Sequence, residues 1–212
     1  MFLGIDTGTS SINAISVSPE GRLLASADSP MTVSVARPGW SEQNPEDWWN
    51  GTCSAVQTVL TSIESPVVLG VGLSGQMHSL VALDRANRVI RPAILWNDVR
   101  TSAEAAFIRD TVGNQTLRRL TGNPALEGFT ATKLLWMREN EPEQFDRLVH
   151  VLLAKDYIRF RLTGTISTEP SDASGTLLFN VVNGSWSSEM CSLLGIDAGL
   201  LPPIGGSSEI VG

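Results

Sequence analysis

Cysteine and histidine are scarce in this 212-residue chain, and their scarcity excludes several kinds of site. The two cysteines, Cys53 and Cys191, form neither a disulfide framework nor a metal-binding spacing, so we expect a reducing, cytoplasmic environment. The two histidines stand far apart in the sequence, which argues against a histidine metal site. No HExxH motif, CxxC motif or Ser-His-Asp order offers a competing chemistry.

Long apolar runs and basic clusters are also missing. No apolar segment approaches the length that spans a bilayer, and the N-terminus lacks the regions of a signal peptide. The net charge is −7 without any block of Lys and Arg, which argues against a surface that grips a nucleic acid. We therefore expect a soluble protein with neither a membrane nor a nucleic acid as its partner.

The pattern of apolar residues and turns favours one α/β domain with a mixed sheet, long enough to bury a sizeable core. A helix should begin at Asn44-Pro45, where a capping residue precedes proline and two acids. The apolar run 67–74 predicts a strand buried on both faces, and 79–90 predicts a hairpin with its tip at Asp84–Asn87. The remaining predicted strands are 2–6, 12–18, 22–28 and 149–154, and the predicted helices are 45–63, 101–112, 130–140 and 155–162.

The most informative segment is a hydroxyl-rich turn after the first predicted strand. The strand ends at Asp6, and Gly8, Thr9 and Ser10 follow before a second extended segment. Backbone N–H groups and hydroxyls in such a turn can bind a phosphate, and the carboxylate can hold Mg²⁺ directly or through water. It is not a P-loop, because no Gly-Lys-Ser/Thr is present. An ordinary turn between strands, or half of an aspartic protease dyad, would give a similar pattern.

A second segment follows the predicted strand 67–74, where ligands of open α/β sheets bind. There, His78 can exchange a hydrogen bond with a sugar hydroxyl, and Met77 offers an adaptable apolar wall. The alternative is a histidine bonded to neighbouring backbone beside a core methionine.

A third segment places Trp96, Asn97 and Asp98 after another apolar strand. The indole offers a flat face to a sugar ring, and the two polar side chains offer directional hydrogen bonds to its hydroxyls. The alternative is a helix N-cap at Asn97 or Asp98, with Arg100 a solvated surface charge. The segment Ser171–Gly175 could line a cleft, although its composition favours a simple turn. A phosphate turn combined with hydroxyl-binding groups is what phosphoryl transfer to a polyol requires.

Taken together, these motifs resemble the FGGY family of carbohydrate kinases, and Gln-Met-His with Trp-Asn-Asp resembles its xylulokinase branch. The similarity runs through the chain in family order. The matching stretches are Gly4–Ser10, Trp40–Gln43, Pro45–Glu46, Trp48–Trp49, Gly75–His78, Arg91–Asp98, Thr121–Asn123, Gly128–Ala131, Lys133–Trp136, Lys155–Tyr157, Leu162–Gly164, Ser171–Ala173, Gly175–Thr176 and Ser208–Ile210.

The resemblance implies an α/β domain of the ribonuclease-H-like (actin/hexokinase-like ATPase) type, with a mixed sheet flanked by helices. It also implies transfer of the γ-phosphate of ATP to a ketopentose, with D-xylulose as the first candidate and Mg²⁺ as the metal cofactor. The implied roles are metal and phosphate positioning for Asp6, phosphate binding for Gly8, Thr9 and Ser10, sugar contacts for Met77, His78 and Asp98, and pocket walls for Trp96 and Asn97.

Two departures from the family pattern bear on activity. Asn13 stands where the family turn ends with a basic residue, so the charge-assisted contact to phosphate is missing. The family's catalytic aspartate is expected beyond Gly212, as is the C-terminal domain that binds the nucleotide. We therefore expect residues 1–212 to be the N-terminal, sugar- and phosphate-binding domain, inactive alone, with homodimer formation left open. The alternatives are a kinase for another polyol or a sugar acid such as gluconate, and a non-catalytic sugar-binding homologue.

Overall fold

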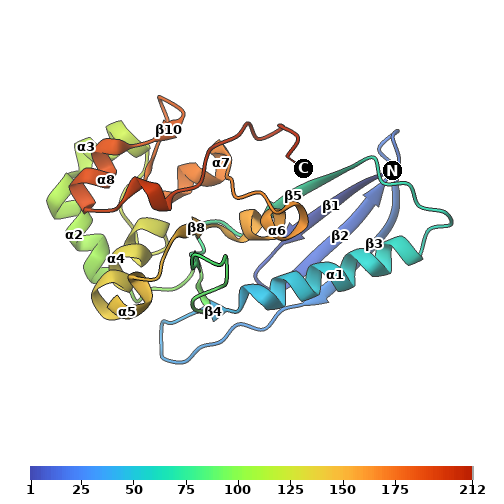
Figure 1. Ribbon diagram of the computed structural model, residues 1–212, viewed down its shortest axis with the longest axis horizontal. Coiled ribbons are helices and arrows are strands. Elements are labelled where there is room, and N and C mark those ends of the chain that lie inside the picture. Colours follow the sequence, from blue (N-terminus) through green and yellow to red (C-terminus); the bar gives the residue numbers. More distant parts are fainter. Residues whose placement is uncertain (212) are drawn as a thin grey trace.

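The computed structural model describes residues 1–211 and contains a four-stranded mixed sheet of order β3-β2-β1-β5 (Figure 1). Strands β1 (Phe2–Thr7), β2 (Ser11–Val17) and β3 (Leu23–Pro30) form the expected antiparallel meander. Strand β5 (Gly70–Gly75) then adds to β1 in the parallel direction. The predicted mixed sheet is confirmed, and the parallel pair brings the carboxyl ends of β1 and β5 to one edge.

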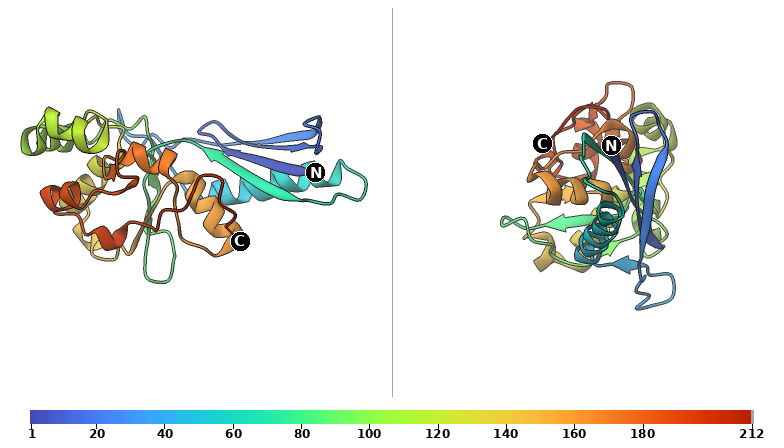
Figure 2. Two further views of the ribbon diagram at one scale, coloured as in Figure 1. Left: turned by 90° about the horizontal axis from the view of Figure 1, so that it is seen from above. Right: turned by 90° about the vertical axis from the view of Figure 1, so that its right-hand side faces the viewer.

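Two helices cover one face of this sheet. Helix α1 (Pro45–Thr61) begins at the predicted cap, where the Asn44 side chain accepts a hydrogen bond from the Glu46 amide at 3.2 Å. Helix α1 packs on β2 and β3, and α6 (Ala154–Thr163) packs beside it on β1 and β5. Both helices lie on the same side of the strands in the right-hand view of Figure 2. The expected mixed sheet flanked by helices is confirmed. Within residues 1–211 the two helices cover one face of the sheet, and Phe2 on β1 is exposed.

The prediction of a doubly buried strand at 67–74 is wrong. Regular pairing begins only at Gly70, and the side chains of Val67, Leu69 and Val71 are 68%, 61% and 49% exposed. The reason is position, because β5 is the last strand of the sheet and pairs only with β1. An apolar run predicts burial without showing which part of a protein covers it.

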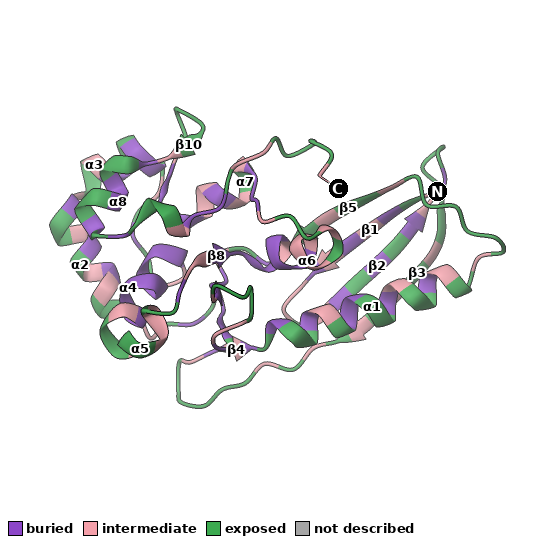
Figure 3. Ribbon diagram, viewed as in Figure 1, coloured by how far each residue is buried: buried purple, intermediate pink, exposed green. Residues whose placement is uncertain are grey.

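The largest core lies outside the sheet, among the helices at the left of Figure 1. Most of α4 is buried, as the purple segment of Figure 3 shows, and it is surrounded by the other helices of this region. These helices are α2 (Ser102–Val112), α3 (Asn114–Thr121), α4 (Thr130–Asn140), α5 (Pro142–Phe145) and α8 (Ser188–Leu194). The predicted helices 101–112, 130–140 and 155–162 are confirmed.

In the part of the chain that the structure describes, six short strands pair outside the four-stranded sheet. Their pairs are β4 (Glu42–Gln43) with β7 (Ala93–Ile94), β6 (Val81–Leu83) with β8 (His150–Leu152), and β9 (Phe179–Asn180) with β10 (Ser185–Trp186). The predicted hairpin keeps its turn at Asp84, but its return arm forms only a bridge between Leu83 and Val89, because β6 pairs with β8 instead. The remaining short elements are α7 (Pro170–Ala173), η1 (Ser174–Thr176) and η2 (Ala198–Leu200). None of the helices described in residues 1–211 has the length and apolar character needed to cross a membrane.

Candidate functional site

The turn between β1 and β2 contacts both of the other predicted segments through one hydroxyl. Trp96 Nε1 donates a hydrogen bond to Thr9 Oγ1 at 3.0 Å, and Thr9 Oγ1 donates to Gln76 Oε1 at 3.2 Å. Thr9 therefore sits between the segment after β5 and the segment after β7. Three motifs that are far apart in the sequence meet at this point.

Two buried glutamines hold the turn from below. Gln43 Nε2 donates to the carbonyl of Thr9 at 2.8 Å, and Gln76 Nε2 donates to Gln43 Oε1 at 3.2 Å. The indole of buried Trp48 also donates to Gln43 Oε1 at 2.9 Å, which fixes the orientation of that amide. No role was expected for either glutamine. The signal that could have identified them is their place in the matching stretches Trp40–Gln43 and Gly75–His78.

Asp6 lies near the carboxyl end of the inner strand β1, in register with Asn13 on β2 and Ser74 on β5. The Ser74 hydroxyl donates to Asp6 Oδ1 at 2.6 Å. These three residues line an open hollow of about 330 Å³. A β-carbon at Gly8 would lie 2.7 Å from the carbonyl oxygen of Ser11, so the tight turn beside this carboxylate requires glycine.

The oxygen ligands at this hollow suit a hydrated Mg²⁺. Asp6 keeps a carboxylate oxygen that accepts no hydrogen bond in the structure, and Mg²⁺ binds to proteins through one or two carboxylates while keeping several waters. Within residues 1–211 no group of three or more His, Cys, Asp or Glu side chains could form a closed metal cage. Asn13, exposed beside Asp6, donates only to Ser11 Oγ at 3.2 Å and brings no positive charge to the hollow.

The ring of His78 is oriented by a hydrogen bond to a backbone carbonyl. Its Nδ1 lies 2.6 Å from the carbonyl oxygen of Gly175, which can only accept, so we assign the ring proton to Nδ1. Burial lowers the pKa of His78, and the cation of Lys133 lowers it further, against the opposing effect of the Gly175 carbonyl. The ring is therefore neutral near pH 7, and its Nε2 is left as a hydrogen-bond acceptor.

The segment Ser171–Gly175 belongs to the site, although its composition favoured a simple turn. A β-carbon at Gly175 would lie 2.5 Å from the ring of His78, so this close approach requires glycine. Helix α7, which includes Ser171–Ala173, is anchored to α6 by Lys155, which pairs with Glu169 and with Asp172 at 3.2 Å. The Gly175 carbonyl that orients His78 is thus fixed to the main body of the protein.

Met77, Trp96 and Asn97 leave surface open to a ligand. Met77 is 56% exposed and Trp96 is 47% exposed, and Asn97 is exposed as well. Ser10, on the turn, is exposed too. These four side chains are therefore accessible to a ligand.

Asp98 is placed differently from the expected sugar contact. It has no exposed surface, and its carboxylate accepts bonds from the Ser41 amide at 2.6 Å and from Arg100 Nη2 at 2.7 Å. The side chain of Arg100 is buried as well, and its guanidinium lies 3.6 Å from the ring centre of Trp40. Arg100 is therefore not a solvated surface charge, and neither Asn97 nor Asp98 caps α2, whose cap is Thr101. Asp98 therefore holds its own loop through Ser41 and Arg100 and has no surface open to a ligand in this structure.

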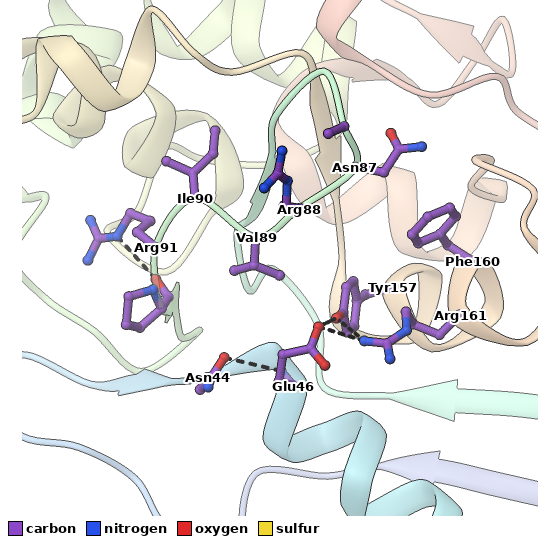
Figure 4. A pocket seen from close by; sticks show the side chains of 12 residues that line it. Asn44, Glu46, Asn87, Arg88, Val89, Ile90, Arg91, Tyr157, Phe160 and Arg161 are labelled. Carbon is purple, nitrogen blue, oxygen red and sulfur yellow. Dashed lines mark hydrogen bonds and ion pairs between the residues drawn. The ribbon is translucent and has the colours of Figure 1, made fainter.

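A larger hollow lies elsewhere, between the N-terminus of α1, the loop 86–92 and α6 (Figure 4). It measures about 770 Å³, and none of the predicted site residues lines it. Its polar groups bond to one another, since Glu46 accepts from Tyr157 and from Arg161, both at 2.6 Å. Burial and this carboxylate raise the pKa of Tyr157 to about 12. We assign no catalytic role to this hollow.

Known proteins are similar to this chain in both sequence and fold. The xylulose kinase of Bacillus subtilis is 42% identical over 212 residues, covering 99% of this chain and 42% of the relative, and that of Escherichia coli is 40% identical, covering 100% and 43%. The crystal structure of a xyloylose kinase from Brucella ovis matches with a TM-score of 0.95 at 38% identity, covering 100% of this chain and 44% of the other. A gluconate kinase from Lactobacillus acidophilus matches with a TM-score of 0.94 at 25% identity, covering 100% and 43%.

The chain thus spans less than half the length of the relatives it matches. Residues 1–212 match the family model described as the FGGY family of carbohydrate kinases, N-terminal domain. The chain belongs to the FGGY family of carbohydrate kinases.

Proposed function

We propose that this chain is the sugar- and phosphate-binding part of an ATP-dependent kinase for a ketopentose, with D-xylulose as the first candidate. The observation that carries the proposal is the pair of hydrogen bonds at Thr9, which joins the phosphate turn to the segments of His78 and Trp96. The choice of sugar rests on relatives named xylulose kinases at about 40% identity.

The turn would bind the terminal phosphates of ATP. The exposed hydroxyl of Ser10 and the backbone N–H groups around Gly8 would donate to phosphate oxygens. Asp6, oriented by Ser74, would hold Mg²⁺ through water. When bound, the ion would neutralise negative charge on the transferring phosphate.

The pocket beside the turn would bind the sugar. His78 Nε2 would accept a hydrogen bond from a sugar hydroxyl, because its Nδ1 is committed to Gly175. Met77 and Trp96 would pack against the carbon skeleton, and Asn97 would bond a further hydroxyl. We propose that Asp98 acts indirectly, by holding the loop through Ser41 and Arg100.

The acceptor hydroxyl needs a general base within hydrogen-bond reach. In the family pattern this base follows residue 212, and the adenosine pocket belongs to a C-terminal domain. We therefore propose that residues 1–212 are inactive alone and that the longer protein closes over both substrates.

The test is a coupled assay of ATP consumption with D-xylulose, using the full-length protein and residues 1–212. We expect turnover only with the full-length protein. Turnover by residues 1–212 above a no-protein control would contradict the placement of the base, and no turnover by the full-length protein with any sugar would contradict the kinase.

A sugar acid is the second candidate substrate, because the gluconate kinase of Lactobacillus acidophilus shares the fold at a TM-score of 0.94. A few contacts decide such preferences. Comparing kcat/KM for D-xylulose and gluconate separates the two. A non-catalytic homologue, suggested by Asn13, would bind sugar without consuming ATP.

A further inference from the structure

Lys133, on the first turn of α4, is a fully buried lysine with an unusual environment. Lysines are almost never fully buried unless they are paired with an anion. Within residues 1–211, however, Lys133 forms no ion pair with a carboxylate. Its ammonium donates instead to two backbone carbonyls, those of His78 and Gly128, each at 2.7 Å.

The first carbonyl belongs to a residue in a strained conformation. His78 has a φ of +63°, in the left-handed region that residues other than glycine rarely adopt. The hydroxyl of Thr130, also on α4, donates to the same carbonyl at 3.2 Å. The ring of Phe129 lies 4.6 Å from the ring of His78. The start of α4 therefore holds the His78 backbone in the conformation that presents its ring.

The second carbonyl connects Lys133 to the opposite wall of the pocket. A β-carbon at Gly128 would lie 2.6 Å from the carbonyl oxygen of Trp96, so the Gly128 backbone packs directly on the Trp96 segment. A single ammonium thus bridges the two segments on which the pocket depends.

We propose that Lys133 is a positioning residue for the sugar pocket: its two hydrogen bonds set the relative placement of His78 and Trp96. The proposal rests on the proposed function of these residues. Burial lowers the pKa of Lys133 to about 7, with nearby Asp98 raising it and Arg100 lowering it. Such a costly group is not needed to pack a helix, since an apolar side chain would do so without the cost of burying a charge.

The test uses the full-length protein and the variant Lys133→Met, which keeps the apolar stem and removes the donors. We expect KM for D-xylulose to rise about tenfold, the size of a lost charged hydrogen bond, with KM for ATP changed much less. The matched control is Leu134→Ala, the next residue on α4, which is buried in the helical core. It should lower the melting temperature while leaving KM for the sugar unchanged.

Equal KM values for the sugar in wild type and Lys133→Met, or the same change in Leu134→Ala, would overturn the proposal. If Lys133→Met does not fold, Thr130→Val removes the weaker donor to the same carbonyl, and KM for the sugar should rise about twofold to threefold. An unchanged KM in that variant would also overturn it.

A readout without substrate separates this proposal from the proposed function. In protein labelled with ¹⁵N-histidine, the Nδ1–H signal of His78 should shift or exchange faster in Lys133→Met and stay unchanged in Leu134→Ala. If the wild type phosphorylates no sugar, the kinase assignment fails, yet this signal still tests whether Lys133 positions His78. An unchanged His78 signal in Lys133→Met would contradict the positioning role whatever the activity.

Discussion

The indole of Trp96 donates a hydrogen bond to the hydroxyl of Thr9 at 3.0 Å, across a sequence separation of 87 residues. Because the Thr9 hydroxyl also donates a hydrogen bond to Gln76 Oε1, the turn after β1 is tied both to Trp96 and to the segment after β5, so the proposed phosphate and sugar sites are coupled. A change at one position should therefore affect the binding of both substrates.

Replacing Thr9 by valine tests this coupling. Thr9→Val removes the hydroxyl and leaves the indole N–H and the Gln76 oxygen without their partner, at a cost of about 1–3 kcal/mol. We expect KM to rise for both ATP and D-xylulose in steady-state kinetics of the full-length protein. Thr9→Ser keeps the hydroxyl and should stay close to wild type. A rise confined to one substrate would contradict the coupling.

Replacing Asp98 distinguishes a role in folding stability from a role in sugar binding. Asp98→Ala leaves the buried guanidinium of Arg100 with only Glu42 at 2.8 Å as its anionic partner. We expect the free energy of unfolding to fall by about 3–5 kcal/mol in urea titrations. The control is Glu189→Ala, which breaks the exposed pair with Arg119 and should cost less than about 1 kcal/mol. A large rise in KM for the sugar with unchanged stability would show that Asp98 contacts the substrate after all.

Asn13 is the position where a substitution is expected to strengthen the binding of ATP. Asn13→Lys places a cation on the hollow of Asp6, where a charge-assisted bond to phosphate is worth about 1.5–3 kcal/mol. KM for ATP in the full-length protein should fall about tenfold. Gln57→Lys, which adds the same charge on the exposed face of α1, should leave it unchanged. The same KM in all three proteins would mean that Asn13 does not face the nucleotide.

Lys133 predicts a specific pH dependence of stability. Its folded-state pKa is about 7 against an ordinary 10.5, so between these values the unfolded chain binds more protons than the folded one. Stability due to this group is therefore lowest below pH 7 and rises as the pH increases toward 10.5. The free energy of unfolding of the wild type should therefore increase relative to that of Lys133→Met between pH 6 and pH 9.

Lys155 provides the control for that measurement. Burial alone would lower its pKa, but Asp172 and Glu169 outweigh this and raise it above the ordinary value. Its contribution is present throughout the range below pH 10.5 and is lost only above it. Lys155→Met should therefore lose stability already at pH 6, where the loss for Lys133→Met is smallest. A pH-independent difference for Lys133→Met would contradict the assigned pKa.

Local signals in the sequence predicted local structure well. The cap at Asn44 and the proline after it defined the start of α1, because capping is decided within one turn of the helix. The strands β1 to β3 followed from alternation and turn residues in the same way. The placement of the phosphate turn beside two distant segments depended on family motifs, which carry information that a single strand pattern does not.

The remaining errors concern partners that are distant in the sequence. Asp98 was expected to contact the sugar or to cap a helix, and Arg100 to be a solvated surface charge. Both side chains are buried instead, because Trp40 packs against Arg100 and the Ser41 amide bonds to Asp98. The roles of Gly175 and Lys133 depend on contacts with His78 across 97 and 55 residues, which no local pattern shows. The run 67–74 was misjudged because burial depends on what else packs there.

We propose that His78 is part of a sugar pocket beside the turn after β1. Isothermal titration of D-xylulose into the full-length protein and its His78→Ala variant tests this claim directly, with His150→Ala as the control at the other histidine. We predict that His78→Ala weakens binding about tenfold or more while His150→Ala binds as wild type does. Equal affinity in wild type and His78→Ala would contradict the account.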